Sequence, residues 1–234
     1  MSIRDLKGEV ENKIPVDNVI VSVSDKVGLE DFIIGLLYIN HDIKFLSTGG
    51  TYKKLKEILG GNSRINLFEI SEYTGCPEME GGLVKTLHPK IHAGILGERN
   101  NPEHQKYITE TLNGVYIDMV VVNLYPFEKT IAQKDVTFEQ ARGNIDIGGP
   151  AMLRAAAKNF PSCAAVCDPS DYKLILDEIK ENNGCTTLAQ RLNLAKKVFA
   201  LTAEYDKTIA DYMFEQIHHN LNGVTRCYKF SGDN

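Results

Sequence analysis

Two strand patterns, each followed directly by a helix pattern, stand next to one another near the start of the chain and constrain its fold more than any other feature. The first is the β-branched run Val19–Val23, followed by apolar residues at helical spacing between Leu29 and Leu37. The second is the run Ile43–Ser47, followed by the helix pattern of Tyr52–Leu59. Consecutive strand–helix units favour parallel strands joined by right-handed crossovers, so we expect an α/β fold.

The second unit contains a loop suited to binding a phosphate group. The segment Ser47-Thr-Gly-Gly-Thr51 joins strand to helix, and its glycines let the backbone approach an anion closely. The free N–H groups of the first helical turn would point at the anion, and the hydroxyls of Ser47, Thr48 and Thr51 would add donors. The alternative is an ordinary turn in which Thr51 caps the helix. The loop matches neither the dinucleotide motif G-x-G-x-x-G nor the loop G-x-x-x-x-G-K-[ST].

Later patterns complete a mostly parallel sheet of about five strands with helices on both faces. Arg64–Ile70 is predicted as an edge strand, Ile117–Leu124 as a buried central strand and Ser162–Cys167 as the fifth strand. Apolar residues at helical spacing over Leu188–Ile217 predict a C-terminal helical segment of one long or two shorter helices. Shorter helices are predicted at Pro102–Thr111, Thr137–Arg142, Ala151–Asn159 and Asp171–Lys180.

The two ends of the chain are polar and are predicted to lie outside this core. Met1–Asp17 is expected to be a loose lead-in, and residues 218–234 a frayed tail. The 234 residues suffice for one large α/β core, so residues 1–217 are predicted to form a single domain.

Composition excludes several classes of function. The chain has 26 basic and 31 acidic residues, a net charge of −5 and no basic block, so nucleic acid is not an expected partner. Five cysteines without a C-x-x-C pair, behind an N-terminus that is not apolar, predict a reduced cytoplasmic protein without structural disulfides. No apolar run approaches eighteen residues, so no membrane span is expected. His88 and His92 lie four residues apart, but Pro89 disfavours a regular helix through them, and no metal site is predicted.

Two further segments are predicted to lie beside the phosphate loop. Ligands of open α/β sheets bind at the carboxyl ends of the strands, which places Asn123 and Tyr125 there. Pro150, behind Gly148 and Gly149, is expected to start a helix whose N-terminus faces an anion or a developing negative charge.

Six motifs, taken together and in this order, resemble inosine monophosphate (IMP) cyclohydrolase. They are Ser22-Val-Ser-Asp-Lys26, Ser47-Thr-Gly-Gly-Thr51, Val84-Lys-Thr-Leu-His-Pro89, Asn123-Leu-Tyr-Pro-Phe127, Asn144-Ile-Asp-Ile-Gly-Gly149 and Arg154-Ala-Ala-Ala-Lys-Asn159. The resemblance extends from about Val19 to Tyr212. That family is the N-terminal domain of the bifunctional AICAR formyltransferase/IMP cyclohydrolase, and its fold is similar to methylglyoxal synthase.

The resemblance implies a reaction and its partners. The family closes the purine ring of 5-formamidoimidazole-4-carboxamide ribotide (FAICAR) to IMP with loss of water, the final step of de novo purine biosynthesis. Because the attack is intramolecular, neither a metal nor a redox cofactor is needed. The formyltransferase domain is expected to be absent from this chain, so a separate formyltransferase is an expected partner, as is a second copy in a homodimer.

The resemblance also implies the residues of the site. Four match the family's catalytic positions: Lys85, Tyr125, Asp146 and Lys158. Asp146 would orient or deprotonate the carboxamide, while the other three would move protons and stabilise the oxyanion. The implied substrate-binding residues are Ser24, Asp25, Lys26, Ser47, Thr48, Gly49, Gly50, Thr51, Val84, Thr86, Asn123, Leu124, Ile147 and Gly148.

Other interpretations of these residues remain open at the level of sequence. Lys158 follows three alanines on a helix, where a lysine is commonly solvated, and Asp146 beside two glycines could be a turn residue. A non-catalytic sensor of phosphoribosyl nucleotides, or a partner subunit, could be built on the same fold, and methylglyoxal synthase is a weaker alternative. The sequence departs from the family at Leu83, where the family has an arginine that lines the nucleotide pocket. Leu83 is predicted to face the same pocket.

Overall fold

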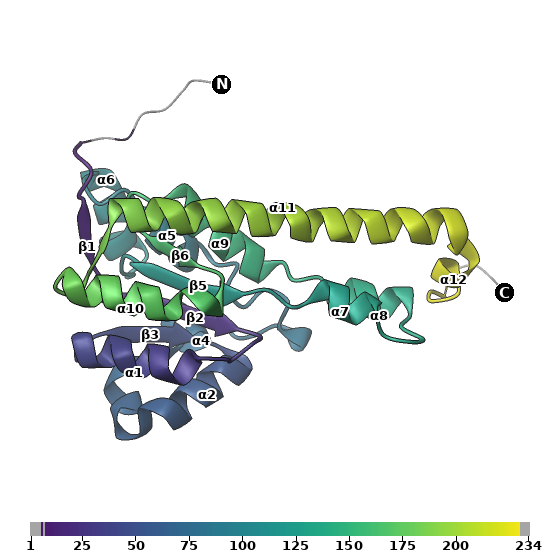
Figure 1. The fold of residues 1–234 in the computed structure, drawn as a ribbon, viewed down its shortest axis with the longest axis horizontal. Helices are drawn as coiled ribbons and strands as arrows, with labels where there is room; N and C mark the ends of the chain where they lie inside the picture. Colours follow the sequence, from purple (N-terminus) through teal and green to yellow (C-terminus); the bar gives the residue numbers. More distant parts are fainter. Residues whose placement is uncertain (1–5, 7, 230–234) are drawn as a thin grey trace.

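A central sheet of five parallel strands, in the order β4-β3-β2-β5-β6, organises the molecule (Figure 1). The computed structural model describes residue 6 and residues 8–229. The strands of this sheet are β2 (Asn18–Val23), β3 (Lys44–Ser47), β4 (Leu67–Glu69), β5 (Met119–Asn123) and β6 (Ala164–Val166). The predicted α/β fold with a mostly parallel sheet of about five strands is confirmed.

Alternating side chains of the central strands build one core on each face of the sheet. Val19 and Val21 of β2 pack in one core, and Ile20 packs in the other. The first core is covered by α1 (Leu29–Ile39), α2 (Gly49–Leu59) and α10 (Tyr172–Glu181). The second is covered by α5 (Pro89–Leu96), α9 (Gly148–Lys158) and α11 (Leu188–His219). Both faces are therefore apolar, as parallel sheets require.

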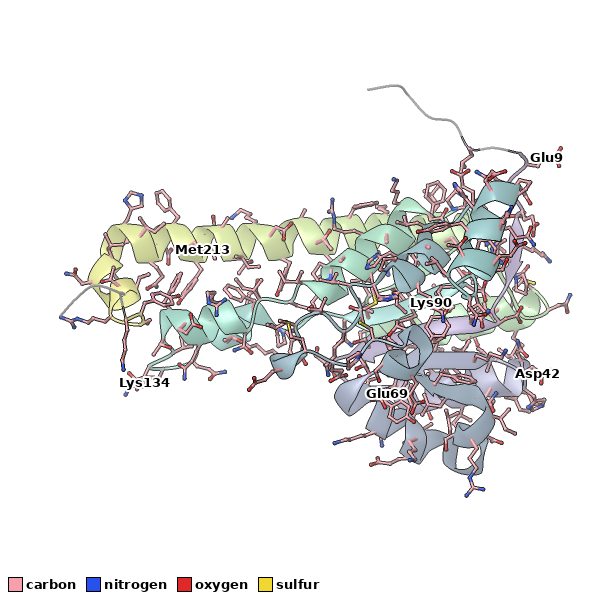
Figure 2. All side chains as sticks on the ribbon, turned by 180° about the vertical axis from the view of Figure 1, so that it is seen from behind. Glu9, Asp42, Glu69, Lys90, Lys134 and Met213 are labelled. Carbon is pink, nitrogen blue, oxygen red and sulfur yellow. The ribbon has the colours of Figure 1, made fainter. Side chains whose placement is uncertain are left out.

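Helix α11 is 32 residues long and extends well past the sheet (Figure 1). Beside its second half lie α7 (Phe127–Ile131), α8 (Phe138–Gly143) and α12 (Leu221–Thr225). The Tyr212 ring lies 5.7 Å from the Phe127 ring and 6.2 Å from the Phe138 ring, measured between centroids. In Figure 2, Met213 marks this projecting part, far from Glu69 at the edge of the sheet.

The predicted C-terminal helical segment is confirmed, and of the two possibilities it forms one long helix, but the prediction of a frayed tail from residue 218 is wrong for the described residues. Helix α11 continues to His219, and α12 follows directly. The polar composition of this segment reflects its exposure and not an absence of structure.

The prediction of a loose N-terminal lead-in is also wrong for part of the segment. Strand β1 (Lys13–Pro15) pairs antiparallel with β7 (Cys185–Thr187), and Ile14 is buried. The fully buried Arg191 guanidinium donates to backbone carbonyls of this region, those of Glu11, Asn12, Phe160, Pro161 and Thr186. The sequence conceals this arrangement because the partners lie far apart along the chain.

The structure differs from the predicted elements at three places. The predicted strand Arg64–Ile70 begins as the short helix α3 (Ser63–Asn66), and only β4 joins the sheet, at its edge as expected. The Asn66 side chain ends that helix by donating to the carbonyls of His41 and Ile43, at 2.9 and 2.7 Å. Ile70 already belongs to α4 (Ile70–Thr74). The predicted helix at Pro102–Thr111 divides into α6 (Pro102–Lys106) and a π-helical turn.

Among residues 8–229, no helix combines the length and the apolar character needed to cross a membrane. Cys163 and Cys167 are buried in the second core.

Candidate active site

A cavity of about 580 Å³ opens at the carboxyl ends of the central strands. Most of the predicted site residues line it: Ser24, Lys26, Thr48, Gly49, Gly50, Thr51, Lys85, Thr86, Asn123, Tyr125, Asp146, Ile147 and Gly148. The lining does not include Asp25, Ser47, Val84, Leu124 or Lys158. It does include residues that the motifs did not assign, namely Ser22, Val23, Gly81, Gly82, Gly143, Asn144, Ile145, Gly149 and Met152.

The phosphate loop enters α2 with its backbone open toward the cavity. Thr48 is the N-cap residue, but its side chain accepts no hydrogen bond from the helix. Gly49 has a φ of 57°, and a Cβ placed there would lie 3.5 Å from the Lys85 ammonium nitrogen. A Cβ at Gly50 would meet no protein atom within 4 Å. The loop therefore leaves free space in front of the helix N-terminus, where an anion is favoured.

Two of the three hydroxyls assigned to this anion are used within the fold instead. Ser47 is fully buried, and its Oγ donates to the Val21 carbonyl at 2.7 Å. The Thr51 Oγ1 donates to the Val23 carbonyl at 3.0 Å and accepts from the Val23 N–H at 3.1 Å. Both hydroxyls tie the loop to β2, and Thr51 does not cap the helix. Thr48 alone keeps a hydroxyl at the front of the loop.

That hydroxyl and the Lys85 ammonium both contact the carboxylate of Glu78. Thr48 Oγ1 donates to one oxygen at 2.8 Å, and Lys85 Nζ lies 2.8 Å from the other. The hydrogen bond from Lys85 holds the pKa of Glu78 below its ordinary value, so the carboxylate is charged at neutral pH. No motif singles out Glu78, which lies in the irregular segment after α4.

The loop of Ser24, Asp25 and Lys26 is fixed by the side chain of Asn123 at the end of β5. Asn123 Oδ1 accepts from the backbone N–H groups of Ser24 and Asp25, at 2.7 and 2.9 Å, and from the Ser24 hydroxyl at 2.8 Å. Its Nδ2 donates to the Asp25 carbonyl at 2.8 Å. Lys26 Nζ lies 3.4 Å from the carbonyls of Val23 and Ser24, at the cavity wall. This network positions Lys26 as a cation at the site.

Asp146 is fixed at the start of α9 by contacts from three elements. Its Oδ1 accepts from the Gly149 N–H at 2.9 Å, and its carboxylate accepts from the backbone N–H of Tyr125. Its own N–H donates to the Tyr205 hydroxyl of α11 at 2.8 Å. Burial raises the pKa of Asp146, and the two backbone hydrogen bonds oppose that rise. No local sequence signal could have indicated Tyr205, which is distant in the chain.

The residues Lys85, Tyr125 and Asp146 line the same cavity, whereas Lys158 lies elsewhere. Lys158 is the exposed last residue of α9, while Asp146 precedes the first residue of that helix. A rise of 1.5 Å per residue separates the two ends of α9 by roughly 15 Å. The structure of one chain therefore does not bring Lys158 to the other three.

Tyr125 and Leu83 lie at the open side of the cavity, with 58% and 70% of their surface exposed. The expected position of Leu83 at the pocket agrees with this placement. Thr86 is buried, and a Cβ at Gly148 would lie 2.6 Å from its Oγ1. Only glycine at position 148 allows the N-terminus of α9 to approach the segment of Lys85 and Thr86 so closely.

The cavity thus offers two helix N-termini, the cations Lys26 and Lys85, and the half-buried carboxylate of Asp146. Within the part of the chain that the structure describes, no group of three or more His, Cys, Asp or Glu side chains is placed to hold a metal ion. Such a set can bind an anionic substrate, accept a proton and stabilise a developing negative charge.

Comparison with known proteins assigns the two parts of the chain. Residues 28–151 match the MGS-like domain family. The chain belongs to the MGS-like domain family. Residues 156–232 match a second family, described as AICARFT/IMPCHase bienzyme. The MGS-like segment supplies most of the cavity lining, but Ser22, Val23, Ser24, Lys26 and Met152 lie outside residues 28–151. Tyr205, which contacts Asp146 behind the cavity wall, belongs to the second segment.

Similar proteins support the same assignment. Proteins described as "Bifunctional purine biosynthesis protein PurH" from Pelodictyon phaeoclathratiforme (strain DSM 5477 / BU-1) and Chlorobium phaeobacteroides (strain BS1) are 52% and 51% identical over 199 residues. These matches cover 85% of this chain and 36% of each relative, so the chain spans about a third of their length. A solved structure, "Crystal structure of ForH", is 32% identical with a TM-score of 0.68, and the match covers 83% of this chain and 97% of that one.

Proposed function

We propose that this chain is an IMP cyclohydrolase, which closes the purine ring of FAICAR to give IMP and water. The observation that carries the proposal is that Lys85, Tyr125 and Asp146 line one cavity beside the phosphate loop. The matches to the AICARFT/IMPCHase family and to proteins named for purine biosynthesis support it.

The reaction needs little beyond geometry and proton transfer. The carboxamide nitrogen of FAICAR attacks the formyl carbon of the same molecule, forming the new N–C bond of the ring. The formyl oxygen gains two protons and leaves as water, while the carboxamide nitrogen and the formamide nitrogen each lose one proton as the ring becomes aromatic. Holding the two groups in an attack geometry supplies much of the acceleration, because both already belong to one molecule.

The residues of the cavity fit these steps. Asp146 is the proton acceptor for the carboxamide, and its raised pKa brings it closer to neutral pH, where a general base works best. Lys85 and Tyr125 stabilise the oxyanion and deliver protons to the leaving oxygen. The N-terminus of α9 lies next to Asp146 and favours negative charge at this point.

The phosphate of the ribotide would bind at the N-terminus of α2. Thr48, Gly49 and Gly50 present this end of the helix to the cavity, and Lys26 adds a positive charge at its wall. The phosphate would displace the Glu78 carboxylate from Thr48 and Lys85, because two negative groups that compete for the same donors repel one another.

A spectrophotometric assay of the purified chain with FAICAR at micromolar concentration tests the proposal. We expect IMP to form in the parent and to form far more slowly in Asp146→Asn. Binding of IMP without turnover in the parent would instead select a non-catalytic nucleotide sensor or partner subunit.

We propose further that the functional unit corresponds to residues 1–217, extended through the end of α11, and that it works as a cytoplasmic homodimer with a separate formyltransferase. Exposed apolar side chains on α11, those of Phe199, Phe214 and Ile217, would suit an interface with a second copy. Light scattering of the purified chain tests the homodimer, and a monomer at micromolar concentration would exclude it.

A further inference from the structure

The hydroxyl of Tyr205 reaches the candidate active site from the long helix α11. It accepts the backbone N–H of Asp146 at 2.8 Å, across 59 residues of sequence. Tyr205 is half-buried, and burial is the largest cause that raises the pKa of its phenol, which therefore stays protonated at neutral pH. The contact is made to the backbone, so it fixes the position of residue 146 without occupying its carboxylate.

The ring of Tyr205 also supports the segment that follows Tyr125. It packs edge-on against Phe127, with 6.4 Å between the ring centroids. Phe127 is joined in turn to Tyr125 by a hydrogen bond from its N–H to the Tyr125 carbonyl, at 2.8 Å. One side chain of α11 therefore contacts the two segments that meet at the carboxylate of Asp146.

We propose that Tyr205 is a positioning residue for catalysis, which fixes Asp146 and the Tyr125 segment relative to one another. This inference rests on the proposed IMP cyclohydrolase function. The carboxylate of Asp146 accepts N–H groups from Gly149 and Tyr125, which belong to different elements. These two contacts persist together only if the segments of Gly149 and Tyr125 keep their spacing, and Tyr205 contacts a residue close to each of them, Asp146 and Phe127.

Through Tyr205, the segment of residues 156–232 contributes to a cavity that is lined mainly by the MGS-like segment. The carboxylate lies within residues 28–151, and Tyr205 lies within residues 156–232. A small displacement of a proton acceptor can lower the rate of a positioned reaction severely, so support from outside the sheet affects turnover more than substrate binding.

Tyr205→Phe and Tyr212→Phe form a matched pair for testing this role. Tyr212 lies on the same helix, and its ring also packs against Phe127. No hydrogen bond of its hydroxyl is found among the described residues. Each variant loses one hydroxyl and keeps the aromatic ring, so both are expected to fold with similar melting temperatures. Only Tyr205→Phe leaves the Asp146 N–H without its acceptor.

We expect Tyr205→Phe to lower kcat for IMP formation about tenfold with KM changed less than about twofold, because the loss affects positioning and not substrate contact. Tyr212→Phe should leave both constants unchanged. Amide hydrogen exchange in a peptide spanning residues 143–149 should be faster in Tyr205→Phe than in Tyr212→Phe.

If the parent chain is active and the two variants have equal kcat values, the positioning role is wrong. A fall in kcat that only follows a lower melting temperature would overturn it too, since that pattern indicates general destabilisation. A parent without turnover would refute the proposed function, and the positioning role with it.

Discussion

Helices α2 and α9 both begin with a pair of glycines at the cavity, and each has a carboxylate near its N-terminus. The two carboxylates are held in different ways. At α9 the carboxylate belongs to Asp146, three residues before the Gly149 N–H that it accepts, and Tyr205 fixes its backbone. At α2 the carboxylate belongs to Glu78, 30 residues beyond Thr48, and its contacts are with the side chains of Thr48 and Lys85.

This difference suits the two carboxylates to different roles. Asp146 is suited to react with the substrate, and Glu78 is suited to be displaced by another anion. Backbone donors cannot rotate away, so Asp146 keeps one position, as a proton acceptor must. The contacts of Glu78 come from side chains that another anion could take over, and Glu78 lies at the surface, where ion pairs contribute little. We therefore assign chemistry to the N-terminus of α9 and ligand exchange to the N-terminus of α2.

The largest expected effect is at α9. Asp146→Asn should lower turnover by on the order of 10²-fold or more while IMP still binds, because only the proton acceptor is lost. Since burial raises the pKa of Asp146, its charged form is unfavourable in the folded chain, and the neutral asparagine should leave the melting temperature at neutral pH unchanged or higher. Steady-state kinetics, IMP titration and thermal unfolding measure the three quantities.

Lys158→Ala tests the other end of the same helix. Its loss of turnover should stay below about tenfold, because a single chain keeps Lys158 roughly 15 Å from the start of α9. A loss as large as that of Asp146→Asn would mean that Lys158 acts at the cavity of a second copy, or through a rearrangement of the chain.

At α2, Gly50→Val should weaken IMP binding by roughly thirtyfold, because its branched side chain would fill the space through which the anion approaches. Gly50 does not have a positive φ, and a Cβ there touches no protein atom, so the variant should fold normally. Gly61→Val is the control, since Gly61 is equally open but lies outside the cavity. Titration calorimetry with IMP compares them, and equal affinities would remove the loop from the binding site.

Leu83→Arg should strengthen IMP binding about tenfold by adding one charge-assisted hydrogen bond to the nucleotide. Leu83 is 70% exposed at the cavity, so the arginine can stay hydrated and the melting temperature should not fall. Thermal unfolding with and without IMP measures both effects, because a ligand that binds only the folded state raises the midpoint. A lower midpoint without a larger IMP-induced shift would show that Leu83 packs within the fold.

The smallest expected effect concerns Glu78. Glu78→Gln should strengthen the binding of IMP, and of inorganic phosphate alone, about threefold, because the incoming anion no longer displaces a charged competitor. Glu80→Gln removes the same charge two residues later in the same segment and should change neither affinity. If Glu78→Gln instead weakens the binding of both IMP and phosphate, Glu78 orients Lys85 toward these ligands and is not displaced by them.

The sheet was predictable because its signals are local. The β-branched run Val19–Val23 predicts a strand, whose successive side chains point to opposite faces of a sheet. The run Ile117–Leu124 is apolar enough to lie inside a parallel sheet. The pairing of Ile14 with Thr186 was not predictable, because three-residue strands carry no pattern that names a partner 172 residues away.

The site was predictable in the types of its residues and less so in their contacts. The sequence identifies Ser47 and Thr51 as hydrogen-bond donors. Only the folded structure shows that both hydroxyls donate to carbonyls of β2 and not to a ligand. Glu78 and Tyr205 reach the site through tertiary contacts alone. Lys158 is different, since counting residues along the helix from Gly148 already places it at the opposite end from Asp146.

The pairing of β1 with β7 also sets an order of events during synthesis. Ile14 leaves the ribosome long before Thr186, and at about 5–20 residues per second the 172 residues between them take on the order of ten seconds or more. All five strands of the central sheet precede β7 in the chain, so the sheet can assemble while Ile14 still lacks its partner. The nascent chain would then contain the cavity before Tyr205 and Arg191 can dock. Strand β7 and helix α11 emerge after the central sheet and complete the pairing of β1 and the support of Asp146. In the proposed function, a nascent chain would therefore be able to bind its ligand before it could catalyse the reaction.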